Sequence, residues 1–239
     1  KLRGDWGEGG GVDGGVGVWG WFWPWTFGVW LSGAGVQPVL LAWWRRGAVA
    51  RGGAGCVYDD IVDADLDSKV ARTAARPVAS GRVSKKAAWA WVISLCLIGL
   101  VVLLQLRWQA QVVALASLAL VAAYPFMKRI TWWPQAWLGM VFNWGLLVGW
   151  SELGGAAFGD QHWDAVAALY AGCVTWVIGY DTIYALQDRE DDALVGIRSS
   201  ALRMGARVHA GIAGFYAAAI ALWALGIWLY RPDPVALLA

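Results

Sequence analysis

Long apolar runs with few charges constrain this chain more than any other feature of its sequence. Five clear runs and two weaker ones near the N-terminus lie at 88–106, 110–126, 135–151, 163–187, 209–230, 18–33 and 39–58. About 20 apolar residues are enough for a helix to cross the hydrocarbon core of a bilayer. Helices satisfy their own backbone hydrogen bonds in lipid, and no alternating pattern typical of a β-barrel is visible. The pattern predicts an all-α, polytopic transmembrane bundle of about seven spans.

The overall composition agrees with a membrane protein. Hydrophobic residues make up 59% of the chain and charged residues only 15%, whereas soluble domains carry about 25% charged residues. The net charge of +2 gives no support for a nucleic-acid partner. The three cysteines are far apart and show no metal-binding or redox spacing. We expect a Gly-rich N-terminal segment at 1–17 without a cleavable signal, a transmembrane domain at 18–230, and a tail at 231–239 that begins a further helix.

The charges between the runs predict how the bundle is oriented. Six cations lie at 69–86, two at 128–129 and four at 189–207, while the alternate loops at 107–109 and 152–162 carry one and none. The positive-inside rule places the three basic loops in the cytoplasm, or in the matrix of a mitochondrion. We therefore expect an inner-membrane protein with 59–86 and 188–207 on the same face.

Ten of the seventeen acidic residues fall in two clusters at these basic loops. Their members are Asp59, Asp60, Asp63, Asp65 and Asp67, and then Asp181, Asp188, Glu190, Asp191 and Asp192. In each cluster some aspartates are four residues apart, which stacks like charges on one helical face and costs stability unless cations lie between them. Mg²⁺ prefers oxygen ligands, and arginines bind phosphate in a bidentate manner. Together these features predict a diphosphate site joined to an apolar bundle that accepts a lipid tail.

Three stretches carry a resemblance to a known family. They read "DDIVDADLDSKVARTAARPVASGRVS" (59–84), "YPFMKRITWWPQAWLGMVFNWG" (124–145) and "YDTIYALQDREDDALVGIRSSALRMG" (180–205). In these stretches the chain resembles the UbiA superfamily of intramembrane aromatic prenyltransferases, most closely its members that act on 4-hydroxybenzoate. The resemblance implies a nine-helix family fold whose active cavity opens near the cytoplasmic face.

The resemblance also implies an activity and a set of site residues. The expected reaction is Mg²⁺-dependent transfer of a polyprenyl group from polyprenyl diphosphate to the ring of 4-hydroxybenzoate, ortho to its hydroxyl, through an allylic carbocation in ubiquinone biosynthesis. The expected catalytic residues are Asp63, Asp67, Asp181, Tyr184, Asp188 and Asp192. The expected metal ligands are Asp59, Asp63, Asp67, Asp188 and Asp192. The expected substrate-binding residues are Arg72, Arg76, Lys128, Arg129 and Asn143.

The sequence departs from the family pattern at a few positions, and other functions stay open. Asp59 stands where the family has asparagine, and Gly11, Gly14 and Gly52 stand where it has cations. One alternative is a divalent-cation channel or carrier lined by the acidic clusters, because ionisable residues at membrane depth mark ion routes. A second is a homologue that binds prenyl diphosphate without turnover. Within the family, the acceptor could be a different aromatic compound.

Overall fold

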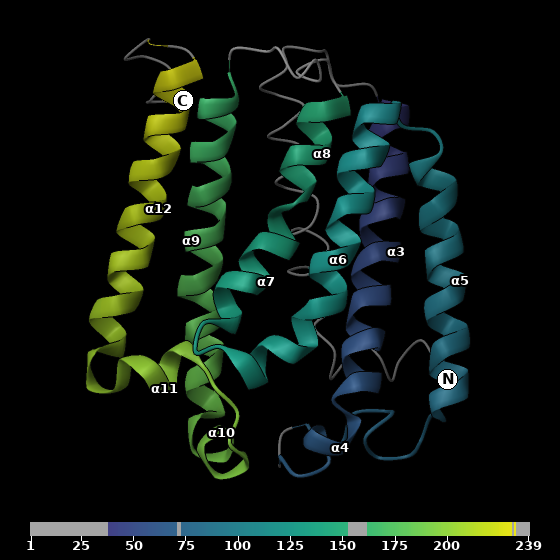
Figure 1. Cartoon of the computed structure of the whole chain (residues 1–239), viewed down its shortest axis with the longest axis vertical. Helices are drawn as coiled ribbons and strands as arrows, with labels where there is room; N and C mark the ends of the chain where they lie inside the picture. Colours follow the sequence, from purple (N-terminus) through teal and green to yellow (C-terminus); the bar gives the residue numbers. More distant parts are fainter. Residues whose placement is uncertain (1–37, 71–72, 153–161, 231, 233–239) are drawn as a thin grey trace.

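The computed structural model describes residues 38–70, 73–152, 162–230 and 232, and all regular structure within them is helical (Figure 1). The helices are α3 (Pro38–Val62), α4 (Ala64–Asp67), α5 (Lys85–Leu103), α6 (Trp108–Ile130), α7 (Pro134–Asn143), α8 (Gly145–Glu152), α9 (Trp163–Gln187), α10 (Arg189–Val195), α11 (Ser200–Met204), the 3₁₀ turn η1 (Gly205–Arg207) and α12 (Val208–Tyr230). The expected segment at 1–17 and the weak run at 18–33 lie outside the described residues. The expected all-α architecture is confirmed.

Four stretches of the described chain are helical, long and apolar enough to cross a membrane: α5, α6, α9 and the stretch Ser200–Tyr230 that ends in α12. They correspond to four of the clear runs in the sequence. The weaker run at 39–58 is also helical, as part of α3. That helix carries Arg45, Arg46 and Arg51, so composition alone does not identify it as a span. The total of about seven spans stays a prediction.

The run at 135–151 is not one helix, and this part of the prediction is wrong. The structure divides it into α7 and α8, which meet at Trp144 and are inclined to each other (Figure 1). The Asn143 side chain donates to the carbonyl of Gly139 at 2.8 Å. Side-chain bonds of this kind compete with the helical ladder and bend helices. The indole Nε1 of Trp144 donates to the carbonyl of Val113 at 2.8 Å, which fixes the break against α6.

Close helix packing holds the bundle together around α9, which lies against α12 on one side and α7 on the other. A side chain at Gly139 would bring its Cβ to 3.0 Å from the Val174 carbonyl oxygen, so the backbones of α7 and α9 approach closely. The outer surface of α5 is apolar and exposed, with Ile93, Leu97 and Val101 more than half exposed. An exposed apolar helix face is expected where lipid replaces water as the solvent.

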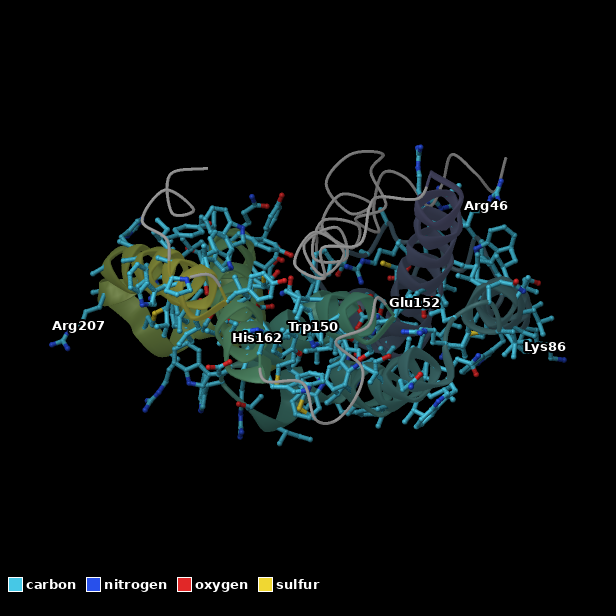
Figure 2. All side chains as sticks on the ribbon, turned by 90° about the horizontal axis from the view of Figure 1, so that it is seen from above. Arg46, Lys86, Trp150, Glu152, His162 and Arg207 are labelled. Carbon is cyan, nitrogen blue, oxygen red and sulfur yellow. The ribbon has the colours of Figure 1, made fainter. Side chains whose placement is uncertain are left out.

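At the end of the bundle opposite α4 and α10, a surface hydrogen bond joins the start of α6 to the end of α8. Seen from above, Trp150, Glu152 and His162 lie near the middle of the bundle, while Arg46, Lys86 and Arg207 project at its periphery (Figure 2). Glu152 Oε2 accepts from the backbone N–H of Arg107 at 2.7 Å. This bond satisfies a donor at the start of α6 that no helical carbonyl can reach.

Candidate active site

A cavity of about 220 Å³ lies at the end of the bundle where α4, α10 and α11 are found (Figure 1). Both acidic clusters contribute to its wall. Among the site residues predicted from the sequence, the acidic ones that line the cavity are Asp59, Asp67, Asp181, Asp188 and Asp192. Arg76, Lys128 and Tyr184 line it as well. Eight of the predicted residues, from segments more than a hundred residues apart, therefore meet in one place.

The first acidic cluster, Asp59 to Asp67, spans a break in the helix. α3 ends at Val62, Asp63 has φ −93° and ψ 3°, and α4 begins at Ala64. Such bridge-region backbone is sparsely populated and recurs at active sites. The hydrogen bonds from Asp63 N to the Asp59 carbonyl and from Asp67 N to the Asp63 carbonyl are both 2.8 Å. The four-residue spacing predicted from a continuous helix is therefore kept across the break.

The Arg76 guanidinium lies close to three carboxylates of the first cluster. Its Nη1 lies 2.9 Å from Asp67 Oδ2, 3.1 Å from Asp60 Oδ1 and 3.9 Å from Asp59 Oδ2. All of these side chains are largely buried. Burial raises the pKa of Asp67 above its ordinary value, and the charge of Arg76 offsets this only in part. The Thr73 hydroxyl donates to the Asp67 carbonyl at 3.0 Å and holds the loop in place.

Asp63 lies behind the cavity wall, although the sequence predicts it as a catalytic metal ligand. It is 1% exposed, and it does not line the cavity. Lys128 Nζ lies 2.8 Å from Asp63 Oδ2, and Arg129 Nη2 lies 3.0 Å from Asp63 Oδ1. Lys128 Nζ also lies 3.5 Å from Asp59 Oδ2. Asp63 thus joins two predicted substrate-binding cations to the end of α3.

The second acidic motif has the same local construction. α9 ends at Gln187, Asp188 has φ −102° and ψ 7°, and α10 starts at Arg189. The backbone N–H of Asp192 donates to the Asp188 carbonyl at 2.8 Å. Gly196 then ends α10 with φ +75°, a left-handed conformation that glycine adopts without a Cβ penalty.

Other cavity residues were not singled out from the sequence. Arg198, counted only as a loop cation, donates through its backbone N to the Lys128 carbonyl at 2.9 Å and through Nη1 to the Ile130 carbonyl at 2.6 Å. Its guanidinium also lies over the Trp132 ring at 5.5 Å. Gln135 and Tyr124 line the cavity too. Gln135 and Tyr124 are uncharged, so clusters of charged residues in the sequence do not point to them.

Among the described residues, Asn143 and Arg129 are predicted for the site but do not line the cavity. Arg72, Gly11 and Gly14 lie outside the described residues. Asn143 is 4% exposed, donates to a carbonyl of its own helix, and does not line the cavity. Arg129 contacts Asp63 but is not part of the cavity wall.

The acidic residues that line the cavity are chemically suited to Mg²⁺. They are aspartates, and their carboxylates are the hard oxygen ligands that Mg²⁺ takes. In the described parts of the chain, no three His, Cys, Asp or Glu side chains converge closely enough to hold an ion. The first motif instead has Arg76 and Lys128 as its counter-charges. Opposed carboxylates from two helix ends fit an ion that arrives together with an anionic ligand.

An all-helical bundle with apolar spans and a carboxylate- and cation-lined cavity at one end defines an integral membrane protein with a cavity suited to a charged ligand. The UbiA prenyltransferase family model matches residues 21–239. The chain therefore belongs to the UbiA prenyltransferase family, as the motifs in its sequence predict.

Several relatives support this assignment. The chain is 45% identical over 212 residues to the mitochondrial 4-hydroxybenzoate polyprenyltransferase of Aedes aegypti, covering 87% of this chain and 47% of that protein. The identity to the Homo sapiens protein of the same name is 39% over 210 residues, covering 85% and 55%. The chain thus spans about half the length of the curated relatives it matches.

Solved structures show the same fold. A UbiA homolog from Aeropyrum pernix K1, in its apo form, has a TM-score of 0.80 and 28% identity, covering 92% of this chain and 82% of that one. A UbiA homolog from Archaeoglobus fulgidus bound to GPP and Mg²⁺ has a TM-score of 0.65 and 17% identity, covering 93% and 79%. The second likeness shows the fold alone.

Proposed function

We propose that the protein transfers a polyprenyl group from polyprenyl diphosphate to the ring of 4-hydroxybenzoate, ortho to the hydroxyl, in ubiquinone biosynthesis. Relatives with this activity in their names are 39–45% identical to the chain. The observation that carries the proposal is the single cavity in which both acidic motifs, Arg76 and Lys128 meet at the end of an apolar bundle. Such a cavity suits a ligand with a diphosphate head and a lipid tail.

Mg²⁺ is the cofactor we assign to this reaction. Asp67, Asp188 and Asp192 would hold it, with Asp59 as a further oxygen donor, because these carboxylates line the cavity. When bound, the ion neutralises negative charge that develops on the departing diphosphate. Asp63 stays in the proposed set through the sequence motif, although in this structure its carboxylate binds Lys128 and Arg129.

The side chains of the protein have further tasks in this scheme. Arg76 and Lys128 bring positive charge to the cavity wall, and preorganised charge of this kind stabilises a departing anion. Loss of diphosphate leaves an allylic carbocation, which the electron-rich ring of the acceptor attacks before the ring loses a proton. The apolar helices exclude water that would otherwise capture the cation. The aromatic face of Tyr184, in the cavity wall, can stabilise the passing charge.

The location of the protein follows from the same scheme. We assign it to an inner membrane, mitochondrial like the named relatives or bacterial, with the cavity facing the matrix or the cytoplasm. The basic loops at this end of the bundle support that orientation. Accessibility labelling of a cysteine introduced at Glu190, on the exposed side of α10, tests it in intact and in opened vesicles.

The deciding experiment is a transfer assay in membranes that contain the chain. We expect Mg²⁺-dependent incorporation of a labelled prenyl group into 4-hydroxybenzoate. Chelation should abolish it, and added Mg²⁺ should restore it. Asp188→Asn and Asp192→Asn should each lower the rate by about 10²-fold or more, as the loss of one preorganised electrostatic contact does. Glu190→Gln is the matched control, because Glu190 lies on the same short helix but not in the cavity wall.

Three outcomes would contradict the proposal. If membranes with the unaltered chain transfer no prenyl group to any aromatic acceptor, the enzymatic assignment fails. Tight binding of prenyl diphosphate without turnover would then identify a binding homologue. Divalent-cation flux into proteoliposomes in the absence of prenyl diphosphate would identify a channel or carrier.

A further inference from the structure

The side chain of Gln135 occupies an unusual place in the cavity wall. Gln135 is the second residue of α7, after Pro134 at the first helical position. Only 5% of its surface is exposed, yet it lines the cavity. A buried carboxamide needs hydrogen-bond partners for its oxygen and its NH₂ group.

A hydrogen bond determines which way the carboxamide faces. The backbone N–H of Ser200 donates to Gln135 Oε1 at 3.1 Å. Because an N–H can only donate, the oxygen of the amide must face Ser200 and the nitrogen must face away. The amide orientation is therefore set by the first residue of α11.

Ser200 is itself held by a buried chain of hydroxyls. Its Oγ lies 2.6 Å from Thr182 Oγ1, and Thr182 donates its only hydroxyl proton to the Ile178 carbonyl at 2.6 Å. The Ser200 hydroxyl must then be the donor to Thr182. Both residues are fully buried. Gln135 is thus fixed to α9 through a directed series of hydrogen bonds.

The other end of the amide has no such partner. Within the described residues, no group accepts a hydrogen bond from Gln135 Nε2. This nitrogen is not fully enclosed by protein atoms. Nε2 therefore opens on the cavity. Arg76 Nη1 and Lys128 Nζ, in contrast, contact carboxylates of the first cluster. Leaving a buried donor unsatisfied costs stability unless a ligand or water accepts from it.

We propose that Gln135 binds substrate, donating from Nε2 to an anionic oxygen of the bound ligand, and that Ser200 positions it. This inference rests on the proposed function. The oxygen belongs to the diphosphate of the prenyl donor or to the carboxylate of the acceptor, which offer the same chemistry. A neutral donor is suited to this wall, because a cation there would pair with the surrounding aspartates as Arg76 does. The positive end of the α7 dipole lies at the same residues and favours the same charge.

The binding experiment uses the purified chain in nanodiscs. Calorimetry gives the Kd of inorganic pyrophosphate with Mg²⁺ and, separately, the Kd of 4-hydroxybenzoate. Gln135→Glu keeps an oxygen for the Ser200 N–H but removes the donor. We expect it to weaken binding of one of the two ligands by about 10-fold or more, the value of a hydrogen bond to a charged group. Gln135→Met removes the donor without adding charge and replaces the first variant if that one does not fold.

Two variants at Ser200 test the positioning role. Ser200→Ala removes only the hydroxyl, whereas Ser200→Pro removes the hydroxyl and the N–H that binds Gln135. Proline is tolerated at the first position of a helix. The backbone of Ser199, at φ −144° and ψ 158°, already has the extended conformation required before proline. We expect Ser200→Pro to weaken binding several-fold more than Ser200→Ala, and for the same ligand that Gln135→Met affects.

The outcomes separate the inference from the function on which it rests. If the unaltered chain binds neither ligand, the proposed function fails. If it binds them and both Gln135 variants stay within about twofold of it, Gln135 does not contact substrate and the inference is wrong. Equal affinities of the Ser200→Ala and Ser200→Pro variants would refute the positioning role. A loss confined to the pyrophosphate arm or to the 4-hydroxybenzoate arm supports the inference and identifies the oxygen.

Discussion

Replacing Arg76 by methionine should strongly destabilise the metal-free protein. The guanidinium lies within about 4 Å of three carboxylates, and its two shortest contacts are 2.9 Å to Asp67 and 3.1 Å to Asp60. Asp60 and Asp67 are 4% and 7% exposed. Methionine would keep most of the packing volume but leave two neighbouring buried carboxylates without their common cation.

The expected cost follows from these contacts. One ion pair at about 4 Å is worth roughly 4 kcal/mol at an effective dielectric constant near 20. Much of this only offsets the desolvation of the charges. Removing one partner of a buried pair therefore costs about 3–5 kcal/mol, because the remaining charge stays buried. Arg76→Lys keeps the charge but loses the planar fork, and it should cost about 1.5–3 kcal/mol, the value of one charge-assisted hydrogen bond.

Reversible unfolding in lipid, followed by tryptophan fluorescence without divalent ions, measures both free energies. Arg82→Met is the control, because Arg82 lies in the same loop and donates at the surface to Ser80 and to the Ala75 carbonyl. We expect the control to change the free energy of unfolding by less than about 1 kcal/mol. If Arg76→Met also changes it by less than 1 kcal/mol, Arg76 is not the counter-charge of the first motif.

Other variants probe separate parts of the structure. In the Arg76→Met protein, added Mg²⁺ should raise the Tm more than in the unaltered protein, because the released carboxylates gain a cation; equal shifts would contradict this. Asp63→Asn should cost about 3 kcal/mol in unfolding free energy because it breaks buried ion pairs, whereas Glu190→Gln, at an exposed carboxylate of the second cluster, should cost less than about 1 kcal/mol; equal costs would place the two residues in similar environments. Gly139→Ala should cost about 1–3 kcal/mol by forcing α7 from α9, and a neutral result would show that the helices can separate. Trp144→Phe removes one hydrogen bond at the α7–α8 break and should lower stability by about 1 kcal/mol, as a shifted denaturation midpoint would show.

The sequence predicts most of the bundle because long apolar runs have one stable form in lipid. It fails at 135–151 for a physical reason. Asn143 and Trp144 end α7 through bonds to the Gly139 and Val113 carbonyls, and neither bond changes the apolar character of the run. Hydropathy indicates whether a segment lies in lipid. A helix break depends instead on the hydrogen-bond partners that side chains find after folding.

The site shows a similar division. Charge clustering finds the residues that carry formal charge, so Asp67, Asp188 and Arg76 are predicted and meet in the cavity. It cannot distinguish a carboxylate that faces the cavity from one that is enclosed by cations. Asp63 has the motif position of a metal ligand, but Lys128 and Arg129 occupy both of its oxygens in this structure. Its surroundings are set by Lys128 and Arg129 at the end of α6, more than sixty residues away in the sequence.

The two acidic clusters share a local structure that the spacing of their aspartates does not define by itself. Each contains an aspartate, Asp63 or Asp188, at which a long helix ends in bridge-region backbone and a short helix follows. In each, the N–H of the aspartate four residues later, Asp67 or Asp192, donates back to that carbonyl at 2.8 Å. The break ends each long helix beside the cavity, which Asp67 and Asp192 both line. The carboxylates of the two clusters gather at one end of the bundle, while α5, α6 and α12 supply long apolar stretches. A charged ligand with a lipid tail requires this separation of a polar end from an apolar bundle.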